Sequence, residues 1–107
     1  RLSVTTSEWD DLPEALLQSD ATNICDVCSS CFRLLAGLCQ RDRGRQAAVR
    51  SLGGLEALLR CLGAPPLRRG PEAAVNGCWM LMVLCNNHPE NQDFVLAHGG
   101  TAMLLRL

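Results

Sequence analysis

The chain repeats its own sequence at an offset of 46 residues. When residues 27–61 are placed over residues 73–107 without a gap, ten of the thirty-five aligned positions are identical. The identities comprise apolar residues, a cysteine, a glutamine, an arginine and a Gly-Gly pair. The tetrapeptide at 14–17 also recurs at 56–59, an offset of 42. A period in the forties is typical of a solenoid of stacked helix sets, in which neighbouring sets bury a shared core.

Apolar residues recur at spacings of three and four along most of the chain, which predicts amphipathic helices. Ser19 or Asp20 is expected to cap one helix, and Asn87 or His88 another. Each Gly-Gly pair is expected to end a short helix by a left-handed turn. The predicted helices span residues 12–18, 20–40, 45–52, 55–62, 71–86 and 89–98, with a further helix starting after Gly100; residues 63–71 form a proline-rich loop.

The same periodicity predicts which side of each helix faces the core. The expected inward residues are Ala48, Val49 and Leu52 in the first short helix, and Leu58, Leu59 and Leu62 in the helix that follows. In the long helix over 71–86 they are Ala74, Val75, Cys78, Leu81, Met82 and Cys85. The core is expected to be aliphatic because the chain has only two Trp, two Phe and no Tyr.

Residues 44–62 and 89–107 resemble the first two helices of armadillo repeats, and residues 71–86 resemble the long third helix. The resemblance covers about residues 12–107. It implies one all-α domain over 1–107, an armadillo-type right-handed α-solenoid of about two three-helix repeats. HEAT repeats are the main structural alternative, but they lack the short first helix with its glycine turn. The implied divisions are a partial repeat at 12–40, a complete repeat at 44–86 and the start of a further repeat at 89–107.

The resemblance also implies a concave binding face along the long third helices. In peptide-binding members such as importin-α, this helix carries a Trp and, four residues later, an Asn that grips the peptide backbone. Gly37 and Val83 stand where the Asn is expected, so the usual peptide ladder is doubtful. Arg33 and Trp79 are equivalent, and either form a cation–π pair, clamp a ligand, or serve packing and solvation only. The implied face consists of Ser30, Arg33, Gly37, Gln40, Asn76, Trp79, Val83 and Asn86.

Charge is unevenly distributed along a chain whose net charge is −1. Residues 33–69 contain eight arginines and two acids, whereas residues 1–26 contain six acids and one arginine. All basic residues are arginine, whose planar fork suits carboxylates, although codon bias also explains that usage. No aromatic residue interleaves the arginines, so nucleic acid is not the expected ligand. We expect an acidic protein segment as partner, with a basic edge formed by Arg41, Arg43, Arg45 and Arg50.

Seven cysteines raise the possibility of a metal site. Cys25, Cys28 and Cys31 have suggestive spacing, but they lie within a predicted helix, whereas zinc-binding Cys-x2-Cys pairs lie on tight turns. We therefore expect the cysteines to pack in the core, and a cysteine-based metal-binding module is the less favoured alternative. No cofactor is expected. The odd count without a secretory signal favours a reducing compartment, the cytoplasm or nucleus.

The sequence favours a non-enzymatic scaffold or adaptor that binds a protein. No phosphate-binding loop, nucleophile–base spacing or membrane-length apolar run is present. The alternative is an armadillo-like co-chaperone, a nucleotide-exchange-type regulator that grips a folded partner. The chain begins with Arg1 and stops at Leu107 in an apolar pattern, which is typical of a segment of a longer protein. Self-association through cut repeat ends and marginal stability are therefore expected.

Overall fold

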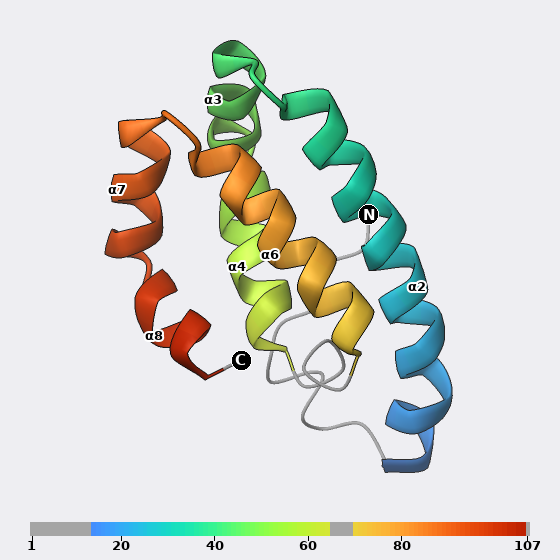
Figure 1. Ribbon diagram of the computed structural model, residues 1–107. Coiled ribbons are helices and arrows are strands. Elements are labelled where there is room, and N and C mark those ends of the chain that lie inside the picture. The colour runs from blue at the N-terminus through green and yellow to red at the C-terminus, as the bar shows by residue number, and fades with distance from the viewer. Residues whose placement is uncertain (1–13, 65–69, 107) are drawn as a thin grey trace.

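The protein is all helical in the residues that the computed structural model describes. These are residues 14–64 and 70–106 for the backbone, with side chains from residue 26 onward. No strand occurs among them, and none of their helices is both long and apolar enough to cross a lipid bilayer. The helices are α2 (Glu14–Cys39), α3 (Arg43–Ser51), α4 (Gly54–Gly63), α6 (Pro71–Cys85), α7 (Pro89–Ala97) and α8 (Gly100–Leu105) (Figure 1).

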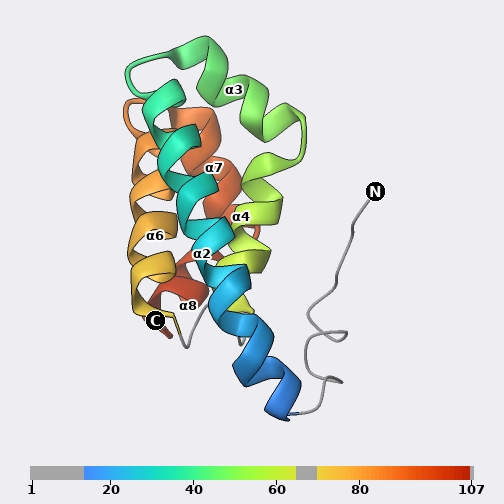
Figure 2. The same cartoon turned by 90° about the vertical axis from the view of Figure 1, so that its right-hand side faces the viewer.

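Helix α6 lies at the centre of the arrangement. It runs beside α2 in the same direction, and it also packs against α3, α4 and α7. Figure 1 shows α7 and α8 on the side of α6 away from α2, and Figure 2 shows α3 crossing the end where α2 finishes. The two longest helices are therefore neighbours, with the shorter helices behind and beside them.

The core is aliphatic apart from Phe32, as the composition predicts. It forms where α2, α4 and α6 meet, and the predicted inward residues Leu58, Leu59 and Leu62 are all buried there. Removing such side chains from water is the main favourable term in folding. The most deeply buried apolar side chains are Ala36 and Cys39 of α2, Leu55, Leu58 and Leu62 of α4, and Ala73, Met80 and Leu84 of α6.

Both Gly-Gly pairs form the predicted left-handed turns. Gly53 has φ 86° and Gly99 has φ 75°, a region that residues with a Cβ rarely adopt. The second glycine of each pair permits a close approach, because a Cβ on Gly54 or Gly100 would collide with the valine five residues earlier. The pairs α3–α4 and α7–α8 are thus joined in the same way, as their sequence repeat predicts.

The predicted cap of α7 is also confirmed. His88 precedes the helix, and its Nδ1 accepts a hydrogen bond from the backbone N–H of Asn91 at 3.2 Å. Pro89 occupies the first turn, where its missing N–H leaves no helical bond unmade. Asp42, 46 residues earlier, caps α3 by accepting from the backbone N–H of Arg45 at 3.0 Å.

The predicted break between helices at 12–18 and 20–40 was wrong. Helix α2 is continuous from Glu14 to Cys39, so Ser19 and Asp20 lie inside it and not at a helix start. Residues 14–36 contain neither proline nor glycine, and a cap-forming polar residue does not by itself end a helix. Residues 12–13 of the partial repeat and residues 65–69 of the loop lie outside the described residues.

Several predicted inward positions were wrong as well. Leu52 is 87% exposed and Ala48 is exposed, whereas Gln46 is buried because its side-chain amide donates to the Val83 carbonyl at 2.9 Å. On α6, Val75 and Met82 are exposed, and the fully buried side holds Ala73, Gly77, Met80 and Leu84. Helix α6 is apolar around most of its circumference, so periodicity alone does not select the side that packs.

Candidate functional site

Trp79 stands between two surface hollows where α2 and α6 run side by side. Its side chain is 38% exposed, which is unusual for a large aromatic residue next to a core. The first hollow has a volume of about 380 Å³ and is bordered by Ser30, Arg33, Leu34 and Trp79. The second has a volume of about 220 Å³ and is bordered by Gln40, Arg41, Trp79, Met82, Val83 and Asn86.

The close approach of α2 and α6 depends on Gly77. A Cβ at this position would lie 2.7 Å from Cδ2 of Leu62 and 3.2 Å from Cε2 of Phe32, so a side chain there would force both neighbours to shift. A hydrogen bond from Nδ2 of Asn76 to Oγ of Ser29 also joins the two helices. These contacts place Trp79, two residues after Gly77, beside the polar side of α2.

The structure brings most of the predicted concave-face residues to these hollows. Ser30 and Arg33 border the first, and Gln40 and Asn86 border the second. Val83 contributes to the second hollow although its side chain is buried. Asn76 and Gly37 border neither hollow, and Asn76 is occupied by Ser29. Whether the residues bind a ligand stays a prediction.

Sequence reasoning missed three residues that complete the hollows. Leu34 and Met82 were grouped with the apolar faces of their helices, and Arg41 with the basic edge. Arg41 reaches the second hollow from the turn after α2, where its φ of 58° is left-handed. The available signal was helical spacing, because residues 33 and 34 lie three and four positions after residue 30, and residues 79, 82, 83 and 86 share a side of their helix.

Each hollow carries one exposed arginine. Arg33 borders the first and Arg41 the second, and no acidic side chain among the described residues borders either one. Arg33 and Trp79 border the same hollow, and the three predicted arrangements, a cation–π pair, a ligand clamp, or separate packing and solvation, stay predictions. The site is therefore an aromatic ring flanked by positive charge.

The other three arginines of the predicted basic edge make contacts within the chain. Arg43 donates to the Asn87 carbonyl at 3.0 Å and forms an ion pair with Glu90 at 3.2 Å. Arg45 donates to the Leu38 carbonyl at 3.0 Å, and Arg50 donates to Oδ1 of Asn91 at 2.9 Å.

Glu90 shows the effect of this network on a titratable group. A hydrogen bond from its own backbone N–H, and then the charge of Arg43, hold the pKa of its carboxyl below the usual value. Arg43, Arg45 and Arg50 thus connect α3 to its neighbours, and Arg41 is the member of the basic edge that borders a hollow.

Among the described cysteines, Cys39 is buried, Cys31 is exposed, and Cys28, Cys61, Cys78 and Cys85 are partly buried. Burial raises the pKa of Cys39, Cys61, Cys78 and Cys85, which keeps these thiols protonated near neutral pH. Cys31 is exposed on α2. Within the described residues, no three side chains of His, Cys, Asp or Glu gather as a metal site would require. The side chain of Cys25 lies outside the described residues.

We expect Cys31 to react with iodoacetamide at least about tenfold faster than Cys39, because the Cys31 thiol is exposed and the Cys39 thiol is buried. Cys39 is 2% exposed and its pKa is raised, so both access and thiolate population are lower. Mass spectrometry of peptides over a labelling time course measures both rates in one sample. In denaturant the two rates should converge, and similar rates in the folded protein would contradict the burial of Cys39.

Neither histidine lies at the hollows. His88 is buried, with Nδ1 used in the helix cap and Nε2 without a hydrogen-bond partner. The exposed ring of His98 stacks on Phe94, with 3.8 Å between the ring centroids. The hollows therefore offer an aromatic face, guanidinium groups, carboxamides and one hydroxyl, a set suited to binding a polar peptide chain.

Comparisons with known proteins found no relative of this chain. A scan against protein-family models, a search of curated proteins and a search of solved structures each gave no match. Equivalent positions are therefore taken from the repeat at 46 residues within the chain itself.

Proposed function

We propose that this chain is a non-enzymatic protein-interaction module of the armadillo class, which binds an extended acidic segment of a partner protein between α2 and α6. The observation that carries this proposal is the position of Trp79 between two hollows, each with one exposed arginine. An exposed tryptophan supplies apolar contact area at low entropy cost, and is frequent among residues that dominate binding energy.

The order and packing of the helices support the armadillo assignment. Helices α3, α4 and α6 follow the order of short helix, glycine turn, medium helix and long helix. Helices α7 and α8 repeat the first part of that order, and α2 runs beside α6 as consecutive third helices do in the proposed solenoid. The hollows at Trp79 would then belong to its concave face.

The spacing of the two arginines suggests the pattern of the bound segment. Arg33 and Arg41 are eight residues apart; the part of this spacing within α2, from residue 33 to residue 39, spans roughly 9 Å along the helix axis, and the turn that carries Arg41 adds to it. An extended peptide covers that distance in about four residues. We therefore expect two acidic residues about four positions apart, with an apolar residue between them that contacts Trp79.

The carboxamides of the second hollow have a role in this arrangement. Gly37 and Val83 have no side-chain donor or acceptor for a peptide backbone. Gln40 and Asn86 border the second hollow and can both donate to and accept from a peptide. We propose that Gln40 and Asn86 hold the main chain of the ligand. They would do so three residues further along each helix than Gly37 and Val83, where the resemblance places the peptide-gripping Asn.

Replacing Trp79 by alanine should weaken binding of a suitable peptide by about tenfold or more. The probe is a fluorescent peptide with two glutamates four positions apart around a central leucine, measured by fluorescence anisotropy. Helix content and melting temperature should change little because Trp79 is partly exposed. Binding should also weaken as salt is added, since Arg33 and Arg41 are exposed.

Two controls make this result specific. The peptide with glutamines in place of glutamates should bind weakly, and Leu52→Ala, at an exposed leucine directly after α3, should bind like the wild type. Unchanged affinity in Trp79→Ala, or affinity insensitive to salt, would contradict the proposed site. Binding of folded partners with no peptide binding would instead favour the nucleotide-exchange-type alternative.

A further inference from the structure

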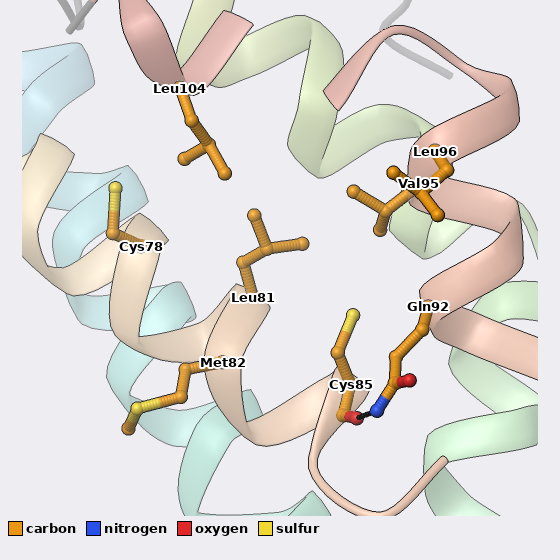
Figure 3. A pocket seen from close by; sticks show the side chains of 8 residues that line it. All are labelled: Cys78, Leu81, Met82, Cys85, Gln92, Val95, Leu96 and Leu104. Carbon is orange, nitrogen blue, oxygen red and sulfur yellow. Dashed lines mark hydrogen bonds between the residues drawn. The ribbon is translucent and has the colours of Figure 1, made fainter. Parts of the chain in front are cut away.

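A third hollow, the α6–α8 groove, lies between α6, α7 and α8 (Figure 3). It has a volume of about 410 Å³ and an apolar lining that includes Cys78, Leu81, Met82, Cys85 and Leu104, with Gln92 as its polar member. In Figure 3, Leu81 and Leu104 point into the space from opposite sides. Such an apolar surface on one side of a helix set is typical of a contact with another helix.

The same groove occurs a second time in the molecule, where it is filled. Moving the eight lining residues back by 46 positions gives Phe32, Leu35, Ala36, Cys39, Gln46, Val49, Arg50 and Leu58. Five of them are buried, Leu35 and Val49 are partly buried and pack against the core, and Arg50 is partly buried. They belong to α2, α3 and α4, the helices against which α6 packs. The occupant of the equivalent groove is therefore α6, a helix.

The two glutamines at equivalent positions show the difference between filled and open grooves. Gln46 donates to the Val83 carbonyl of the occupying helix at 2.9 Å. Gln92 donates instead to the carbonyl of Cys85, on the helix that forms the wall of its own groove, at 2.8 Å (Figure 3). Gln92 is exposed, so it can exchange this bond for a carbonyl of an incoming helix.

A stripe with the required pattern is exposed on α2. Helix α6 buries Ala73, Gly77, Met80 and Leu84 in its groove. The residues 46 positions earlier, here called the α2 stripe, are Val27, Cys31, Leu34 and Leu38, and all four are exposed. They lie on the side of α2 opposite to Phe32 and Ala36, as helical spacing requires. No described helix covers them.

The side-chain sizes of the α2 stripe and of the α6–α8 groove are also complementary. Within the chain, Gly77 packs against the ring of Phe32. At the equivalent positions, the stripe carries Cys31 and the groove carries Cys78. A glycine and a phenylalanine are thus replaced by two side chains of intermediate size, a volume-conserving change that packed interfaces tolerate.

We infer that the α2 stripe of a second copy of this chain docks in the α6–α8 groove. The second copy would then provide the long helix that follows α7 and α8, and Gln92 would donate to its Gly37 carbonyl, the equivalent of Val83. Because stripe and groove are different surfaces, the contact is head to tail, and a row of copies can grow without closing. The contact adjoins the site proposed at Trp79, because Leu34 of the stripe also borders the first hollow and Met82 of the groove also borders the second.

Sedimentation velocity of the 107-residue chain over a concentration series tests the inference. The weight-average mass should rise with concentration and pass that of a dimer. Leu38→Asp places a charge at the C-terminal end of the stripe, and Leu104→Asp places a charge in the groove at a side chain that is already 41% exposed. Each variant alone should be monomeric, with affinity lowered by about a hundredfold, since a charge buried against apolar side chains is unpaired.

Mixing the two variants gives the sharper result. Leu38→Asp retains an intact groove and Leu104→Asp an intact stripe, so an equimolar mixture should form a one-to-one dimer that grows no further. A short bismaleimide should link Cys78 in the groove of Leu38→Asp to Cys31 in the stripe of Leu104→Asp. Leu52→Asp, at an exposed leucine directly after α3, should assemble like the wild type, and so should Trp79→Ala. Circular dichroism checks that each variant folds, and Leu96→Asp replaces Leu104→Asp if that variant does not.

Other outcomes overturn the inference. A wild-type chain that remains monomeric at high micromolar concentration has no such contact. Assembly that survives Leu38→Asp does not use the stripe. Two variants that are each monomeric and do not combine when mixed indicate a symmetric interface in which both surfaces are needed on every copy.

Discussion

Replacing Asn91 by alanine is expected to lower the free energy of unfolding by about 2–4 kcal/mol, because buried polar groups would lose their partners. Asn91 is fully buried, and its Nδ2 donates to the carbonyls of Gln46 at 3.1 Å and Leu84 at 2.7 Å. Its Oδ1 accepts from Arg50 at 2.9 Å. One side chain therefore connects α7 to α3 and to the end of α6.

The Leu84 carbonyl makes this loss costly. It lies in the last turn of α6, where carbonyls have no helical N–H to accept from, so Asn91 supplies its partner. Urea unfolding followed by circular dichroism measures the change. Gln92→Ala is the matched control, since the neighbouring carboxamide is exposed and makes one hydrogen bond, and it should cost less than about 1 kcal/mol. Equal effects of the two substitutions would contradict the structural role of Asn91.

Leu84→Ala should lower the free energy of unfolding by about 2–5 kcal/mol, the range for a fully buried leucine. Leu84 is 0% exposed, and it faces the core that α2, α4 and α6 share. The cost combines the lost burial of apolar area with the cavity that remains, because the surrounding helices relax only in part. Urea denaturation at low protein concentration measures it without a contribution from self-association.

The chain provides its own control for this substitution. Leu38 is the equivalent leucine 46 residues earlier, but it is 46% exposed on α2. Leu38→Ala should therefore cost less than about 1 kcal/mol. If the two substitutions cost the same, either Leu38 is covered in solution at low concentration or Leu84 is not at the centre of the core.

Much of the secondary structure follows from local signals. The left-handed turns at Gly53 and Gly99, the cap at His88 and the helix start at Pro71 were all predicted, because each depends on residues within one turn. The predicted helix break before residue 20 was wrong because the local signal there is too weak to end a helix. Ser19 and Asp20 favour a cap, but without glycine or proline nearby the helix continues through them.

The candidate site was only partly predictable. Trp79, Arg33, Gln40 and Asn86 follow from the resemblance and its spacing, and the structure places all four at the hollows. The sequence did not show which arginines make contacts within the chain and which ones border a hollow. Whether a guanidinium reaches a carboxylate or carbonyl of another helix depends on how those helices pack, as in the bonds of Arg43 and Arg50 to residues of the α7 region.

The sequence by itself determined the helices, their glycine turns and the equivalence of positions 46 residues apart. Only the tertiary structure decided what each equivalent position does: Leu84 is buried while Leu38 is exposed, and Gln46 bonds to a neighbouring helix while Gln92 bonds to its own groove wall. The reason is physical. Helical geometry is set by nearby residues, whereas burial depends on whether another helix lies against that side, which a repeated sequence does not specify.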